Sequence, residues 1–302
     1  MEAGKLQSPD ALQKWVFGAC PAESRCVALI DPSRYPDTDA CRQALGFGEE
    51  SFAALPNLYA KYSASVRAKG PRLFTAPLEA PGWERIFSEA FHRQAASFLV
   101  MLQSEGLLEH LLQRVRMPQP AGGNALFRFQ DVVVLSTLSP LLRPAQKRAL
   151  LGPASQWLMI DLCSNPVAIE SPGAGVSSPP ALKLDQQQLE ALDLALVPLT
   201  IIFQANETDS TLLADMDKCA QVDLIRRRMH HAQMHGLSRE EDVGLYCVLS
   251  LQLPEGFDQV GPVAEALKRS RAHGTGFSEE IDRVPVERWR ELDEVLDSLH
   301  SE

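Results

Sequence analysis

The chain has 302 residues, of which 45% are hydrophobic and 23% charged, with a formal net charge of −10 at pH 7. This length favours two lobes over one compact domain, and the acidic balance argues against general affinity for nucleic acid, because phosphate binding needs a positive surface. No segment approaches the roughly 18 uninterrupted apolar residues of a membrane-spanning helix. Acidic and polar residues also stand where a signal peptide would have its apolar core. We therefore expect a cytoplasmic protein that contacts neither membrane nor nucleic acid.

The first half of the chain predicts a short sheet surrounded by helices. Residues 27–30 are expected as a buried strand, and Asp31 with Pro32 forms its exit turn. Strand-end carboxylates are often catalytic, but Asp31 can also cap this turn through its own side chain. Further strands are expected within residues 70–77 and at residues 98–102.

An amphipathic helix is expected after the third of these strands. Leu107, Leu111 and Leu112 recur at helical spacing and are predicted to face the core, whereas Glu109 and Arg114 are predicted to face solvent. Such a stripe is typical of core packing and not of cofactor binding.

The stretch GNALFRFQDVVVL, residues 123–135, places an arginine and an aspartate within an apolar run. Residues 125–129 alternate as a half-buried strand, and Asp131 precedes a valine-rich helix, where it is a natural N-cap worth about 1 kcal/mol. Arg128 lies on the strand face opposite Phe127 and Phe129, from which it could bond Asp131 or reach a partner. The corner is therefore either a structural cap or a site of recognition.

A proline-, glycine- and serine-rich stretch, residues 164–183, is expected to connect two lobes. The predicted fold class is α+β: an N-terminal mixed α/β lobe with a short sheet, residues 1–163, followed by a mostly α-helical C-terminal lobe, residues 184–302. The residues up to 183 hold 18 Lys and Arg against 16 Asp and Glu, while those from 184 hold 11 against 23. The acidity of the chain is thus concentrated in the helical lobe, where it could serve solubility or steer a basic partner segment.

Several local signals place the helices of the second lobe. Asp185 with Gln188 resembles a capping box, and Pro198 is expected to interrupt the helix that follows. Ser238 with Glu241 predicts another capped start, and residues 286–300 predict a final helix.

The sequence carries few signals of catalysis or of cofactor binding. The chain has no GxGxxG, P-loop, GxSxG or HExxH motif, and its six cysteines form no CxxC pair. His231 and His235 stand one helical turn apart and could chelate a metal, but no third ligand occurs at a recognisable spacing and Gly236 ends the helix. We therefore expect no catalytic residue, no cofactor and no metal.

Four stretches of the chain carry a resemblance to a known family. CVALIDPSRYP, GPRLF, GNALFRFQDVVVL with LLGPASQW, and AQMHGLSREEDVGLYCVLSLQL occur in the order of the signatures of the domain of unknown function 4123 family, the type VI secretion effector adaptors or chaperones. The LFRF-x-D corner is the strongest element of the resemblance. The chain departs from the family in two places. Val132 and Val133 stand where family members usually have proline and arginine after the aspartate. The stretch LIDPSRYP matches only loosely the leucine-aspartate-glycine-alanine sequence that is usual in the family.

This resemblance implies a non-enzymatic, cytoplasmic chaperone and adaptor. Its partners would be the N-terminal region of one secreted effector and the spike protein VgrG, at whose tip it would help to load that toxin. The candidate partner-contact residues are Arg128, Asp131, Phe127, Phe129 and Asp31. Two other classes stay open from the residues alone: a metal-dependent or carboxylate-based hydrolase built around Asp31, Asp131 and the histidines, and a structural subunit of another complex.

Overall fold

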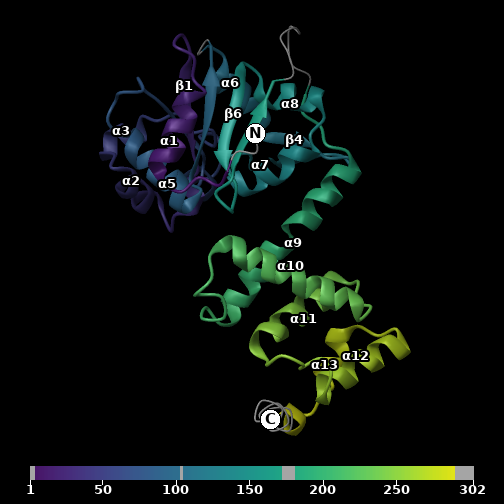
Figure 1. Ribbon diagram of the computed structural model, residues 1–302. Helices are drawn as coiled ribbons and strands as arrows, with labels where there is room; N and C mark the ends of the chain where they lie inside the picture. Colours follow the sequence, from purple (N-terminus) through teal and green to yellow (C-terminus); the bar gives the residue numbers. More distant parts are fainter. Residues whose placement is uncertain (1–3, 103–104, 172–180, 290–302) are drawn as a thin grey trace. The chain divides into compact units, whose positions relative to one another are not determined.

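The computed structural model describes residues 4–102, 105–171 and 181–289 (Figure 1). The chain divides into two compact units, Met1–Ala195 and Leu196–Glu302. The first unit holds a five-stranded antiparallel sheet with helices, and the second is helical, so the protein has an α+β fold as the sequence predicts.

The sheet of the first unit has the strand order β2-β1-β3-β6-β7, with every neighbouring pair antiparallel. β1 spans Arg25–Ile30, β2 spans Arg72–Thr75 and β3 spans Ala96–Met101. β6 spans Ala154–Ile160 and β7 spans Pro166–Glu170. The strands predicted near residues 27–30, 70–77 and 98–102 are therefore confirmed.

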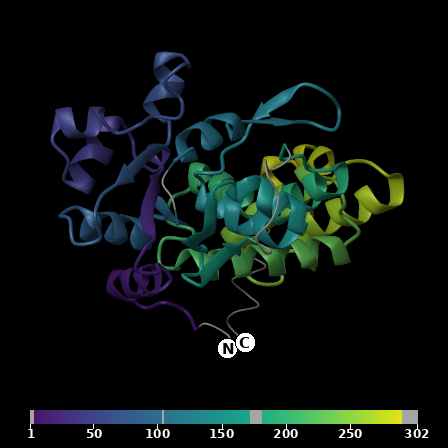
Figure 2. The same cartoon turned by 90° about the horizontal axis from the view of Figure 1, so that it is seen from above.

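Helices cover both faces of this sheet (Figures 1 and 2). On one face, Phe98 stacks on Phe87 of α5 (Trp83–Arg93) with a ring-centroid distance of 4.5 Å, and α1 (Pro9–Gly18) and α2 (Thr38–Leu45) pack around them. Alternate residues of a strand point to opposite faces. Ser97 accordingly lies on the other face, where it accepts a 2.8 Å hydrogen bond from Nε1 of Trp157. Both central strands, β1 and β3, are almost completely buried as a result.

The second face is covered by α7 (Val132–Leu138) and α8 (Pro144–Leu151), and α6 (Leu107–Arg114) packs against α8. The prediction for α6 is wrong at two positions, since Leu112 is exposed and Arg114 is buried. Arg114 donates from Nε to the carbonyl oxygen of Ala149 at 2.8 Å, so its charged head is satisfied between two helices. The helical pattern alone predicts that charged residues face solvent, because it does not show which hydrogen-bond acceptors another helix will supply.

Shorter elements complete the first unit. They are the 3-10 helices η1 (Pro32–Arg34) and η2 (Ser139–Leu141), the helices α3 (Glu49–Ala53) and α4 (Ala64–Ala68), and the hairpin of β4 (Arg116–Pro118) with β5 (Asn124–Leu126).

The region expected to be a connector contributes to the sheet. Within residues 164–183, β7 forms the edge strand and buries Ile169, while proline stands at its first position, as an edge strand allows. Residues 172–180 of the expected connector lie outside the described residues. The division between the units falls instead within the long helix α9 (Gln186–Thr208), so the predicted boundaries at 163 and 184 differ from the observed one.

The start of α9 is fixed to the first unit. Asp185 and Gln188 form the predicted reciprocal cap, with hydrogen bonds of 3.1 and 2.9 Å. Gln188 also donates to the carbonyl oxygen of Leu141 at 2.7 Å. The expected interruption at Pro198 is wrong, because the helix continues through it. Proline removes one backbone donor, and the hydrogen bonds on either side still hold a helix of this length.

The second unit consists of the remainder of α9 with α10 (Lys218–Met234), α11 (Glu240–Gln252), α12 (Gly261–His273) and α13 (Phe277–Asp282). Its core includes Ile225, Tyr246 and Phe277. The predicted cap at Ser238 is wrong: Arg239 is the N-cap of α11, and the acidic residues of the first turn complement the helix dipole instead. Residues 290–300 of the predicted final helix lie outside the described residues.

One helix among the described residues, α9, is long and apolar enough to cross a membrane by length and composition alone. The same test is passed by core helices of soluble proteins, and 28% of the apolar window of α9 is buried within the structure. This is weak evidence for a membrane span.

Candidate functional site

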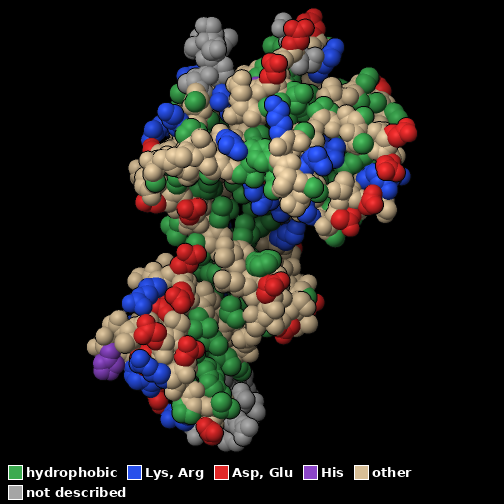
Figure 3. Space-filling model, turned by 180° about the vertical axis from the view of Figure 1, so that it is seen from behind, with side chains coloured by type: hydrophobic (Ala, Val, Ile, Leu, Met, Phe, Trp, Pro, Cys, Tyr) green, Lys and Arg blue, Asp and Glu red, His purple; other side chains and the backbone are tan. Residues whose placement is uncertain are grey.

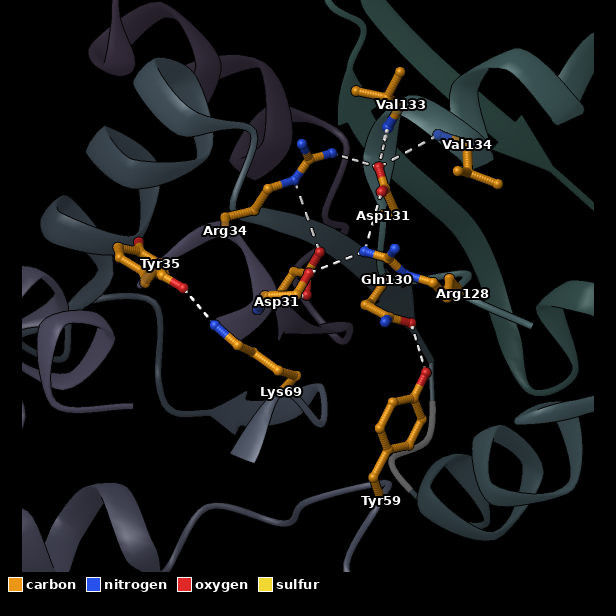
Figure 4. Close-up of polar contacts among 11 residues, drawn as sticks. Asp31, Arg34, Tyr35, Tyr59, Lys69, Arg128, Gln130, Asp131, Val133 and Val134 are labelled. Carbon is orange, nitrogen blue, oxygen red and sulfur yellow. Dashed lines mark hydrogen bonds and ion pairs between the residues drawn. The ribbon is translucent and has the colours of Figure 1, made fainter. Parts of the chain in front are cut away.

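The end of β1 and the beginning of α7 meet in a polar corner, which contains Asp31 and Asp131 (Figure 4). The backbone N–H of Asp31 donates to the carbonyl oxygen of Ala95 at 2.8 Å, which extends the β1–β3 pairing into the turn. Oδ1 of Asp31 accepts from the N–H of Ser33 at 3.0 Å. Asp31 therefore caps η1, as the sequence predicts.

Asp131 is the N-cap of α7, and this prediction is also confirmed. Its Oδ1 accepts from the backbone N–H groups of Val133 at 3.1 Å and Val134 at 3.4 Å. The same oxygen accepts a hydrogen bond from Nη2 of Arg34. One carboxylate thus satisfies the first turn of a helix and a guanidinium from the other segment.

Arg34 joins the two aspartates. Its Nε lies 3.8 Å from Oδ2 of Asp31, while its Nη2 bonds Asp131. Oδ2 of Asp31 is buried and makes no hydrogen bond within the described structure. Burial raises the pKa of Asp31, and the hydrogen bonds from Ser33 and the charge of Arg34 offset only part of that effect. A carboxyl group with no exposed surface cannot touch a substrate in this conformation.

Arg128 is the outward-facing member of the corner, with 51% of its side chain exposed. Its Nη2 donates to Oγ of Ser33 at 3.1 Å and lies 3.5 Å from Oδ2 of Asp131. The guanidinium is therefore held by both segments but keeps donors free toward solvent. The adjacent residue, Gln130, is buried and accepts a 3.3 Å hydrogen bond from the hydroxyl of Tyr59.

The two phenylalanines of the corner belong to the core. Phe127 and Phe129 are both buried, and their rings contact each other edge to face at 5.7 Å. Phe129 also packs on Trp157 at 5.9 Å. The expected alternation of buried and exposed side chains around Arg128 is thus confirmed, but the expected strand over residues 125–129 is wrong in extent, because β5 ends at Leu126. The role of the two rings as partner contacts also requires correction, since both are buried and position the backbone that carries Arg128.

The structure does not assemble the ligands of a metal site within its described residues, where no group of three His, Cys, Asp or Glu side chains could hold an ion. His231 is exposed, and His235 bonds Asp258 through Nε2 at 2.8 Å. The sequence patterns did not indicate Asp258 as the residue that bonds His235.

The sequence reasoning also missed Arg34 and Ser33. Arg34 follows Asp31 by three residues in the same turn, which was a weak local signal for an ion pair. Its bond to Asp131 spans 97 residues of sequence and depends on how β1 and α7 pack. Ser33 meets Arg128 for the same reason.

Comparison with known proteins gives no match: no family model, curated protein or solved structure corresponds to this chain.

Proposed function

We propose that the protein is a non-catalytic, cytoplasmic adaptor that binds a type VI secretion effector and helps to load it onto the spike protein VgrG. The proposal rests on the ordered resemblance of the sequence to the effector adaptors. The observation that supports it most directly is the half-exposed guanidinium of Arg128, held at the corner that carries the strongest part of that resemblance.

The corner is suited to recognition because its charge is fixed in place. Two acceptors from separate segments, Ser33 and Asp131, restrain the head of Arg128 before any partner arrives. A restrained side chain loses less conformational entropy on binding than a free surface arginine. The remaining N–H donors can meet a carboxylate or a backbone carbonyl of the effector.

The buried members of the corner act indirectly. Arg34 ties Asp131 to the turn after β1, and the two buried phenylalanines anchor the segment between β5 and α7 that carries Arg128. The roles differ accordingly: Arg128 contacts the partner, whereas Asp31, Asp131, Phe127 and Phe129 position it.

The experiment is affinity capture of the co-expressed effector and spike by the wild-type chain and by the Arg128→Ala variant. We expect Arg128→Ala to reduce capture at least tenfold while thermal stability stays unchanged, because about half of this side chain is in solvent. Arg67→Ala is the matched control, since Arg67 is an exposed arginine of the same unit without a side-chain ion pair in the described structure. It should capture both partners normally.

Two outcomes would contradict the proposal. An effector that stays soluble and is exported normally without this protein would exclude a loading role. Turnover of a substrate that disappears with Asp31→Asn or Asp131→Asn in folded protein would favour the hydrolase instead.

A further inference from the structure

A pocket of about 440 Å³ lies in the second unit, beside the end of α10 and along α12. Its size falls within the range of small-molecule sites, which combine an apolar lining with a few convergent polar groups. Its lining includes His235, Asp258, Ala264, Leu267, Lys268 and Arg271.

The acidic group of this pocket is already satisfied by the protein. Oδ2 of Asp258 accepts from the hydroxyl of Tyr246 at 2.5 Å and contacts Nε2 of His235 at 2.8 Å. Burial and the neighbouring carboxylate raise the pKa of Tyr246, so its hydroxyl remains a neutral donor at physiological pH. Although burial opposes it, the hydrogen bonds from Tyr246 and His235 lower the pKa of Asp258 overall. The carboxylate of Asp258 is thus engaged by Tyr246 and His235.

Two cations lie on the exposed side of the same pocket. Lys268 and Arg271 are three residues apart on α12, so their side chains share a face of the helix. Nη2 of Arg271 lies 3.4 Å from the carbonyl oxygen of Met234, and the guanidinium passes over Gly236, whose φ of +84° closes α10. Lys268 has no ion-pair partner among the described residues. With Asp258 engaged, the pocket presents positive charge in a unit that is otherwise strongly acidic.

We infer that this pocket binds an organic carboxylate, with the anionic group between Lys268 and Arg271 and a small apolar group against Ala272, the exposed apolar residue of the lining. Two sources share this chemistry: a free aliphatic acid, and the C-terminal carboxylate of a polypeptide that ends in an apolar residue. The inference is independent of the adaptor function, because it uses no residue of the corner around Arg128.

The test is calorimetric titration of the full chain with three probes. They are hexanoate, acetyl-Ala-Leu with a free carboxylate, and acetyl-Ala-Leu amide. We expect at least one carboxylate probe to bind and the amide to bind at least tenfold more weakly, because the amide lacks the charge that the two cations recognise. Binding of hexanoate alone identifies a free acid as the ligand, and binding of the free-ended peptide alone identifies a polypeptide terminus.

Variants locate the site. Lys268→Gln and Arg271→Gln should each weaken binding about tenfold, since each removes one charge-assisted hydrogen bond. Arg227→Gln is the control, because Arg227 is an exposed arginine of α10 that does not line the pocket, and it should bind like the wild type.

A second measurement does not depend on the stability of any variant. In wild-type protein with isotope-labelled histidine, the imidazole signals of His235, assigned with His235→Asn, should shift on addition of the carboxylate probe. Absence of binding by both carboxylates at about 10 mM would overturn the inference. Equal binding of acid and amide would overturn it too, as would shifts that spare His235.

Discussion

Nη2 of Arg34 donates to Oδ1 of Asp131, although the two residues are 97 positions apart in the chain. That oxygen also receives the first-turn N–H groups of α7. The helix cap and the packing of the β1 exit turn therefore depend on one carboxylate. Asp131 should contribute more to the stability of the fold than a residue that only caps a helix.

Asp131→Ala should lower the free energy of unfolding by about 2–4 kcal/mol, combining the loss of a cap with the loss of a charge-assisted bond to Arg34. Asp131→Asn should cost less, because its amide oxygen can still accept from the helix. Asp217→Ala is the matched control: Asp217 caps α10 through a single 2.9 Å bond from the N–H of Ala220, and its loss should cost about 1 kcal/mol. Urea unfolding of the three variants measures these values, and equal losses for Asp131→Ala and Asp217→Ala would show that the Arg34 bond adds nothing.

Asp31 should make stability depend on pH in a defined direction. Burial raises its pKa above the ordinary value of 3.8, so the native state retains the proton at pH values where the unfolded chain has lost it. The stabilising contribution of this carboxyl is therefore full below pH 3.8 and is lost as the pH rises through the native pKa. Asp31→Asn removes this contribution but keeps an oxygen that can accept from Ser33.

The difference in unfolding free energy between Asp31→Asn and the wild type isolates this effect, because every other titrating group is common to both. We expect the variant to gain relative stability as the pH rises from 3.8 through the native pKa of Asp31, and denaturant titrations at a series of pH values measure it. A difference that stays constant with pH would show that Asp31 titrates alike in the folded and unfolded chain.

Gly152 ends α8 with a φ of +57°, and a Cβ atom there would stand 2.4 Å from the ring of His110. That ring is buried and contacts the carbonyl oxygen of Leu150 through Nε2 at 2.9 Å, so it cannot move aside freely. Gly152→Ala should therefore cost clearly more than the roughly 1 kcal/mol of a strained backbone alone. Gly274→Ala is the reference for a left-handed backbone alone, since Gly274 has a φ of +66° and a ψ of +19° and nothing within 4 Å of its Cβ position, whereas Gly152 has a ψ of −117°. Thermal unfolding compares the two, and similar losses would show that neither the clash with His110 nor the ψ of Gly152 adds to the cost.

The features that the sequence predicted correctly are those that depend on hydrogen bonds between residues close together in the chain. The caps at Asp31 and Asp131 bond N–H groups two or three residues away, so their geometry follows from the nearby sequence alone. The bond between Arg34 and Asp131, the burial of Arg114 and the contact between His235 and Asp258 each require a distant segment to arrive. No periodicity or motif contains that information. The edge strand β7 was missed for another reason. It is short and lies in a stretch rich in proline, glycine and serine, a composition that is typical of a connector.

The charge of the second unit leads to a prediction about association with the proposed effector. Residues 196–302 hold 11 Lys and Arg against 20 Asp and Glu, a net charge of −9. On the face shown in Figure 3, acidic side chains lie interspersed with basic ones, so any steering would come from the summed field of the unit and not from one continuous patch. Three further acidic residues of this unit, Asp293, Glu294 and Asp297, lie outside the described residues.

If this field steers a basic segment of the effector, the association rate should fall between about 0.05 and 0.5 M salt, as the Debye length shrinks from roughly 14 to 4 Å. Glu207→Lys with Asp215→Lys should slow association more than it changes dissociation, because both side chains are exposed and belong to the acidic unit. Glu23→Lys with Glu105→Lys is the matched control: it changes the total charge equally through exposed residues of the first unit. Stopped-flow or surface-based kinetics measure both rates. Equal slowing by the two double variants would attribute the effect to total charge, and insensitivity to salt would leave the acidic surface a role in solubility alone.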